Sequence, residues 1–214
     1  MRVAVHYNEA ESGARDTVEE IVAAGGEAEM FGADLTRHGA PGALVRSVVA
    51  RMGRLDVLVN SAAVMRRTPW SETTEEEWDA MFALNLRAPF FTAQAVALAM
   101  GAQGGAIVNV ADLAAFETWP AYIPHGISKA GVVQMTRALA RVLAPAIRVN
   151  GVAPGAVLLP DDWSDADAGR MAETTPLGRL GTPQDVVGAV LYLLEAEYVT
   201  GETLIVDGGR HVRR

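Results

Sequence analysis

The sequence predicts an α/β fold, with one domain in which helices cover both faces of a doubly wound parallel sheet. Three observations predict it. Short apolar, β-branched runs alternate with longer segments of helical periodicity along the chain. The 214 residues are long enough for one domain with its own core, and 50% of them are hydrophobic, as in globular proteins. Strands that alternate with helices are joined by right-handed crossovers, and such connections make the sheet parallel.

The strands are expected at short apolar runs bounded by turn residues. In chain order these runs are 2–7, 27–31, 55–60, 106–110, 147–152 and 203–206. The run at 55–60 is almost continuously apolar, which is typical of a parallel strand buried on both faces.

The helices are expected at 11–24, 44–52, 74–100, 123–143 and 183–195. The helix over 74–100 has Thr73 or Thr74 as its N-cap and acidic residues in its first turn. The segment 156–176 is rich in Asp and small residues, so we expect a mobile flap over the strand ends. The basic end of the chain, 210–214, is predicted to be a solvated tail.

Composition excludes several classes of protein. The formal net charge of −8 argues against a nucleic-acid partner, which clustered Lys and Arg would bind. The sequence has no cysteine, so disulfides, thiol catalysis and Cys-ligated zinc are excluded, and we predict no metal site. No apolar run resembles a signal peptide or reaches the roughly 20 residues of a membrane span. We therefore expect a cytoplasmic protein that acts on a small molecule.

Ligands of open parallel sheets bind beyond the carboxyl ends of the strands. Polar and turn residues follow four of the expected strands, namely Asp34, residues 60–63, Asp112 and Pro154 with Gly155. The sequence therefore predicts a binding site at this edge of the sheet.

A set of short motifs carries a family resemblance over essentially the whole length. In order they are Asp34, Asn60-Ser61-Ala62-Ala63, Asn85-Leu86, the stretch from Val108 to Asp112, His125 with Ser128 and Lys129, the stretch from Arg148 to Gly155, Val199-Thr200-Gly201 and Val206-Asp207-Gly208-Gly209. In this order and spacing they resemble the short-chain dehydrogenase/reductases, and within them the pteridine-reductase-like branch. The resemblance implies a Rossmann-like fold and hydride transfer from NAD(P)H to a carbonyl or imine of a small, pteridine-like or aromatic substrate.

The same resemblance assigns the catalytic positions. The family places a proton-donating tyrosine four residues before a lysine, one helical turn away, and a polarising group thirteen residues upstream. Here these positions hold His125, Lys129 and Asp112. Three interpretations remain open. His125 donates the proton, because imidazole titrates near pH ~6.5; or Tyr122 replaces it; or the reductase chemistry is lost. The last would leave a non-redox descendant, either a ligand-binding pseudoenzyme or an acid–base enzyme that uses Asp112 and His125.

Further roles are carried over position by position. Asn85 matches a residue that holds a water of a proton relay. Asp34 matches the family residue that contacts adenine. Residues 60–63, which include Asn60 and Ala62, match the segment that packs on the adenine ribose. Lys129 matches the residue that holds the nicotinamide ribose, and Pro154 with Gly155 the turn beside the nicotinamide. The first strand ends in Tyr7-Asn8 rather than an acidic residue, which favours NADP(H) over NAD(H).

Each of these residues also has an ordinary structural explanation. A histidine near a helix start usually packs or caps, and Asp112 alone is a loop or cap carboxylate. Lys129 alone is a surface cation whose stem packs along its helix. Asn60 and the Pro154-Gly155 pair could simply form strand-end turns.

The resemblance also predicts a missing element. The family begins with a strand, a glycine-rich turn and a helix that hold the cofactor diphosphate, and this chain opens at the equivalent of the second strand. Either the natural start lies earlier, which we favour, or the strands at 2–7 and 55–60 pair directly in an altered sheet. In the family, the long helices equivalent to 74–100 and 123–143 form subunit interfaces, so a homodimer or homotetramer is implied.

Overall fold

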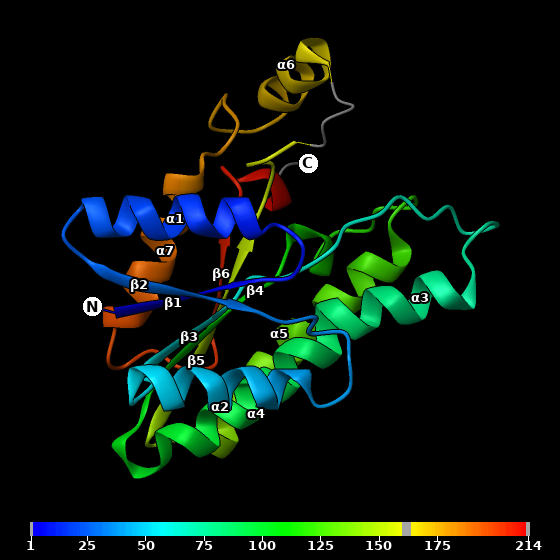
Figure 1. Cartoon of the computed structure of the whole chain (residues 1–214). Helices are drawn as coiled ribbons and strands as arrows, with labels where there is room; N and C mark the ends of the chain where they lie inside the picture. The colour runs from blue at the N-terminus through cyan, green and yellow to red at the C-terminus, as the bar shows by residue number, and fades with distance from the viewer. Residues whose placement is uncertain (1, 160–163, 213–214) are drawn as a thin grey trace.

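The chain adopts an α/β fold in which all described strand pairs are parallel (Figure 1). The computed structural model describes residues 2–159 and 164–212. Its strands are β1 (Arg2–Tyr7), β2 (Glu27–Gly32), β3 (Val57–Asn60), β4 (Gly105–Val110), β5 (Ile147–Pro154) and β6 (Thr203–Val206). Each lies where the apolar runs predict a strand, so the predicted fold class is confirmed.

The helices agree with the sequence pattern except in three places. They are α1 (Glu11–Ala23), α2 (Ala40–Met52), α3 (Glu75–Phe82), α4 (Ala88–Met100), α5 (Ile123–Leu143), α6 (Asp165–Glu173) and α7 (Pro183–Glu195). First, α2 begins four residues before the predicted start at 44, because Pro41 occupies the first turn, where its missing N–H costs nothing.

Second, the helix expected over 74–100 is divided. Thr74 caps α3 in a capping box with Glu77, as one of the two expected N-caps. A π-helical turn, Ala83–Arg87, then separates α3 from α4, and the N–H of Ala88 bonds to the carbonyl of Ala83. Pro89 in the first turn of α4 cannot donate to a carbonyl four residues earlier, and this missing bond accounts for the break.

Third, the segment expected to be a flap contains α6, whose N-cap Ser164 forms a capping box with Asp167. Arg210–Val212 form a 3₁₀ turn. The prediction of a solvated tail is wrong for Arg210, whose side chain is only 13% exposed beside Glu117, whereas His211 and Val212 are exposed as expected. The last two residues of the predicted tail lie outside the described residues.

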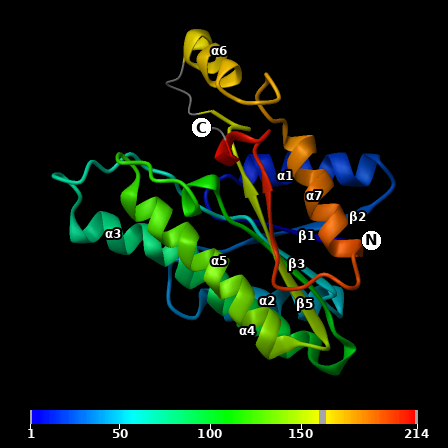
Figure 2. The same cartoon turned by 180° about the vertical axis from the view of Figure 1, so that it is seen from behind.

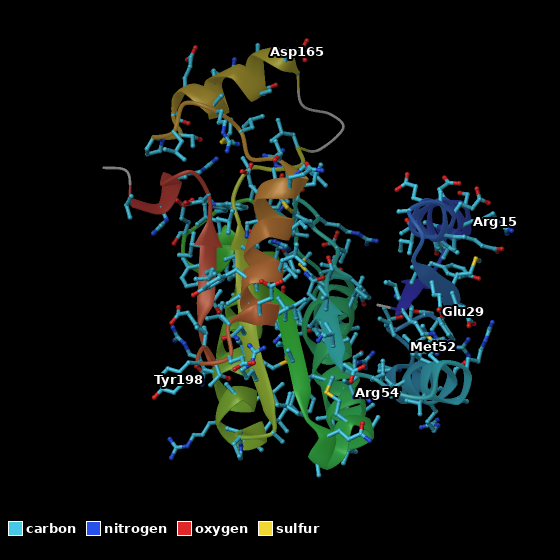
Figure 3. The ribbon with its side chains drawn as sticks, turned by 90° about the vertical axis from the view of Figure 1, so that its left-hand side faces the viewer. Arg15, Glu29, Met52, Arg54, Asp165 and Tyr198 are labelled. Atoms are coloured by element: carbon cyan, nitrogen blue, oxygen red, sulfur yellow. The ribbon has the colours of Figure 1, made fainter. Side chains whose placement is uncertain are left out.

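The strands form two sheets rather than one. Sheet order is β1-β2 in the smaller sheet and β3-β4-β5-β6 in the larger. The alternative in which the strands at 2–7 and 55–60 pair directly is therefore wrong. Figure 3 shows β1, β2, α1 and α2, with Arg15, Glu29 and Met52 labelled, beside the larger sheet and its helices.

Helices cover both faces of the larger sheet at its central strands, β4 and β5. Side chains of α4 and α5 pack with Ile107 and Val149 of the central strands on one face, and Figure 2 shows these two helices side by side. On the other face, Leu193 of α7 packs on Val108 and Val152. The small unit is joined to this core through α2, which packs against α4. None of the described helices is long and apolar enough to span a bilayer.

Candidate active site

One turn of α5 presents the imidazole and the ammonium that the sequence singles out. His125 and Lys129 lie four residues apart in α5 and are 2% and 4% exposed. The interpretation of Lys129 as a surface cation is therefore wrong. Its Nζ donates a hydrogen bond of 2.9 Å to the carbonyl of Val110, at the end of β4.

Asp112 reaches the same place from the loop after β4. Its Oδ1 accepts a 2.7 Å hydrogen bond from the N–H of Ala114 and so caps the short 3₁₀ turn Leu113–Ala115. Its Oδ2 lies 3.6 Å from Nε2 of His125. The interpretation of Asp112 as a capping carboxylate is thus correct for its Oδ1, while its Oδ2 faces the imidazole of His125.

Asn85 fixes the other side of the imidazole. The π-helical turn directs its buried amide toward the loop after β3, where its Oδ1 accepts from the N–H of Val64 at 2.8 Å and its Nδ2 donates to the carbonyl of Val64 at 2.9 Å. The same Nδ2 lies 3.1 Å from Oγ of Ser128 and 3.4 Å from Nδ1 of His125. Ser128 in turn donates to the carbonyl of His125 at 2.7 Å.

These contacts favour a proton on Nε2 of His125. Nδ1 has a donor, the Asn85 amide, at 3.4 Å and an acceptor, the Val64 carbonyl, at 3.3 Å. If Nδ1 accepts, the ring is neutral with its proton on Nε2. If Nδ1 donates, it carries a proton. Nε2 then needs a proton as well to face the Asp112 carboxylate favourably, and a ring with both protons is an imidazolium. In both states the Nε2–H points toward Asp112. Nε2 is buried without a hydrogen-bond partner among the described residues.

The electrostatics around Lys129 are those of a buried cation. Burial lowers the pKa of Lys129 from 10.5 to about 8, and the nearby Asp112 carboxylate offsets part of this shift. With a pKa of about 8, Lys129 is still mostly protonated in the folded chain at pH 7.

The residues that the family resemblance assigns to the cofactor lie at the carboxyl ends of the strands. Their side chains differ in whether they are free to contact a ligand. Asp34, after β2, accepts hydrogen bonds of 2.9 and 2.6 Å from the N–H and hydroxyl of Thr36, and these bonds lower its pKa. Ala62, after β3, is exposed. The side chain of Asn60 points away from a ligand, because its Nδ2 donates 2.9 Å to Asn109 Oδ1 and lies 3.3 Å from the carbonyl of Pro89.

The turn after β5 needs a glycine for packing. A Cβ on Gly155 would lie 2.7 Å from Cβ of Asp207, so glycine is required there whether or not a cofactor binds. Pro154 ends β5 and pairs in register with Val206 of β6.

Three groups near the carboxyl ends of the strands have the chemistry to hold the nicotinamide end of an NAD(P)H cofactor. The orphaned Nε2 of His125, the ammonium of Lys129 and the turn at Pro154 lie on the side of the sheet where the hydride acceptor would be held. For the diphosphate, no glycine-rich turn followed by a helix N-terminus is found after a strand in residues 2–159 and 164–212.

Two further sequence predictions have different outcomes. Tyr122 precedes α5 as its N-cap rather than lying within the helix, so the helical spacing that made it an alternative donor does not hold. Its ring packs edge-on against Trp119, whose Nε1 donates to Glu117. Trp163, which together with Trp119 and Tyr122 would give a substrate pocket a flat aromatic wall, lies outside the described residues.

Comparisons with known proteins agree with this arrangement. The family described as "Enoyl-(Acyl carrier protein) reductase" matches residues 1–211. The chain is 34% identical over 214 residues to the 3-oxoacyl-[acyl-carrier-protein] reductase of Synechocystis, covering 98% of this chain and 86% of that protein.

Solved structures match the backbone closely. An acetoin dehydrogenase from Enterobacter cloacae aligns with a TM-score of 0.91 at 32% identity, covering 100% of this chain and 87% of that one. A mutant short-chain dehydrogenase/reductase from Serratia marcescens aligns with a TM-score of 0.90 at 31% identity, covering 98% and 87% of the two chains.

Fold and comparisons together define the class of this protein as an oxidoreductase with a Rossmann-like fold. Within that class, the chain belongs to the short-chain dehydrogenase/reductase family, whose members use NAD(P)H.

Proposed function

We propose that this protein reduces a carbonyl with NADP(H) and that His125 donates the proton. The observation that carries the proposal is Nε2 of His125, which is buried, unpartnered among the described residues, and 3.6 Å from Oδ2 of Asp112. Bound NADP(H) would supply the hydride. A substrate oxygen that came within hydrogen-bond distance of Nε2 beside Asp112 would receive the Nε2 proton, so the proton reaches the oxygen that gains charge.

The neighbouring residues support this proton transfer in separate ways. Asp112 stabilises the charged imidazole before donation, because its carboxylate is the nearest anion. The side-chain amide of Asn85 contacts Nδ1 of the His125 ring. The same amide bonds to the N–H and the carbonyl of Val64, and these two bonds fix its orientation. Lys129 would hold the nicotinamide ribose with its ammonium, which is hydrogen-bonded to the carbonyl of Val110.

The finer preferences are part of the proposal. NADP(H) is preferred to NAD(H), because Tyr7 and Asn8 at the end of β1 put no carboxylate where a 2′-phosphate would lie. For the substrate we retain a small molecule with a carbonyl. The relative from Synechocystis is named for an oxoacyl substrate and the one from Enterobacter for acetoin, whereas a pteridine-like substrate rests on the motif at Asp112 alone.

We also propose that two copies associate through α4 and α5. Apolar side chains remain outward on these helices, with Leu98 80%, Val142 75% and Ile127 46% exposed. Exposed apolar side chains of this kind suit a two-fold interface. Light scattering should give at least twice the monomer mass, and Leu98→Lys should reduce it.

The decisive experiment replaces the imidazole. His125→Phe should lower turnover of NADPH with a carbonyl panel by about 100-fold or more, the usual value of a general acid. His125→Tyr should retain measurable turnover, because a phenol can donate a proton from the same place. Tyr198→Phe, at a fully exposed position, is the control. Full activity in the Phe variant would refute His125 as the donor, and no turnover in any form would favour a non-redox role for Asp112 and His125.

A further inference from the structure

The segment between β3 and α3 is fixed at two points to the walls of the candidate active site. At the first point, the N–H and carbonyl of Val64 bond to the side-chain amide of Asn85 at 2.8 and 2.9 Å. The same carbonyl lies 3.3 Å from Nδ1 of His125. At the second point, the N–H of Thr68 bonds to the carbonyl of Ala121 at 2.9 Å. Figure 1 shows this segment beside the one that leads into α5. The span between the two points is three residues long, so its place beside the site is fixed.

This span carries two adjacent arginines whose charges are not neutralised. Its residues are Met65, Arg66 and Arg67; Met65 is 43% exposed, and both arginines are exposed as well. Within residues 2–159 and 164–212, neither guanidinium has an ion-pair or hydrogen-bond partner. Each guanidinium has five N–H donors and no acceptor, and the two positive charges repel each other. Both effects favour the binding of an anion at this place.

The arginines lie close to the proton donor along the chain. Arg66 follows Val64 by two residues, which span at most about 7 Å. Val64 itself is in contact with the imidazole of His125 through its carbonyl. The cationic span therefore begins within about one side-chain length of the reacting centre, and a small molecule can reach both.

Asp112 disfavours an acidic group directly beside the reacting carbonyl. Its Oδ2 lies 3.6 Å from Nε2 of His125, the atom proposed to donate the proton. A carboxylate attached to the reacting carbon would come close to this anion and be repelled. The Lys129 ammonium, which would attract such a group, is 4% exposed and bonded to the carbonyl of Val110. An acidic group of the substrate is therefore better placed away from the carbonyl, toward residues 65–67.

We propose that Arg66 and Arg67 bind the carboxylate of an oxo-acid substrate in which several atoms separate the ketone from the acid. A guanidinium matches a carboxylate in shape and charge and forms two parallel hydrogen bonds to it. The two arginines are thus specificity-determining residues, distinct from the residues that transfer the proton. The inference rests on the proposed function, because it names the class of carbonyl that the protein reduces.

Two matched ketones test the acidic group. 4-Acetylbenzoate and 4-acetylbenzamide have the same ketone and ring, and they differ in one negative charge at the far end. Ligand-observed NMR gives the dissociation constant of each for the whole 214-residue chain without cofactor. We expect the benzoate to bind at least about tenfold more tightly, and the difference to shrink as salt rises, because exposed charges are screened. Equal dissociation constants, or no binding of the benzoate at about 10 mM, would overturn the proposal.

Variants assign the preference to the two arginines. Arg66→Gln combined with Arg67→Gln should remove the advantage of the benzoate and leave the affinity for the benzamide, which also reports folding, within about twofold. The matched control is Arg141→Gln, which removes the same charge from an exposed position in the last turn of α5, about 24 Å along the helix from His125. This control should keep the full preference. An equal loss in the control would assign the effect to net charge and refute the proposal, as would an unchanged preference in the double variant.

Turnover separates this inference from the proton donor. With NADPH, the double arginine variant should lose its preference for the benzoate through an increase of about tenfold in KM, because the arginines contact the substrate far from the reacting carbon. The loss should not appear in kcat. If the benzoate binds tightly and the arginines account for it, while His125→Phe keeps full activity, the donor is wrong and the oxo-acid site stands. If His125→Phe is inactive and the wild type treats both ketones alike, the oxo-acid site is wrong and the donor stands.

Discussion

Replacement of Lys129 by Met should remove a defined pH dependence of stability. The pKa of Lys129 is about 8 in the folded chain, against 10.5 for an unperturbed lysine, because burial disfavours the ammonium. The unfolded chain therefore binds this proton more tightly, and the free energy of unfolding rises with pH between about 8 and 10.5 and is independent of Lys129 below that range. Between pH 7 and 9.5 the gain is about 2 kcal/mol, or about 4–8 °C in Tm for a chain of this size.

The assay compares urea unfolding of the wild type and Lys129→Met at pH 7 and 9.5. The difference between the two proteins should change by about 2 kcal/mol, while Arg137→Met, an exposed cation on the same helix, should follow the wild type. Lys129 is the single lysine in the sequence, so a ¹³C-methylated sample gives one lysine signal whose titration near pH 8 can be read directly. Parallel pH profiles of the wild type and Lys129→Met would refute the assigned burial.

Three other changes have expected sizes. Asn85→Ala leaves the Val64 N–H and carbonyl without their side-chain partners and should cost about 2–4 kcal/mol in urea unfolding; a loss below about 0.5 kcal/mol would contradict the network. Thr74→Ala removes the capping box of α3 and should cost about 1 kcal/mol, measured as a lower Tm. Leu193→Ala, at a fully buried position, should cost about 2–5 kcal/mol, against less than about 1 kcal/mol for the half-exposed Leu191→Ala. Calorimetric titration of the 214-residue chain with NADPH should show affinity weaker than micromolar, because the described residues contain no diphosphate turn.

Periodicity predicted most of the fold because the signal is local. The helices at Ile123–Leu143 and Pro183–Glu195 begin and end at the predicted residues, since each has a proline in its first turn and a strongly apolar face. The strand positions follow in the same way from apolar runs. The division into two sheets was less accessible, because pairing depends on which edges meet in space rather than on the pattern of any one strand.

The division of the helix at Ala83–Arg87 had a signal that the periodicity concealed. Apolar residues continue through the π-helical turn, but Pro89 marks the place where a regular helix must lose a hydrogen bond. The helix in the expected flap had a signal as well, the Ser164 and Asp167 pair of a capping box.

The candidate site was predictable where it depends on spacing. Four residues along one helix place His125 and Lys129 one turn apart, and the strand end supplies Asp112. The contacts of Val64 were not predictable, because a backbone N–H and carbonyl carry no residue-type signature. Ser128 belongs to the family motif with His125 and Lys129, but its hydrogen bonds to Asn85 and to the carbonyl of His125 had no signal in the sequence.

Among the described strands, β1 pairs only with β2 and β3 only with β4, and the edge that each leaves without a strand partner affects how the chain behaves at high concentration. The edge of β3, with Val57 and Val59 exposed, and the edge of β1 can pair with strands of other molecules, including partly unfolded ones. Such pairing leads to aggregation. The formal net charge of −8 holds such neighbours apart while ionic strength is low. Salt screens this repulsion over a distance of about 10 Å at 0.1 M and about 3 Å at 1 M, so solubility in this protein should be governed by the acidic surface and fall as salt is added.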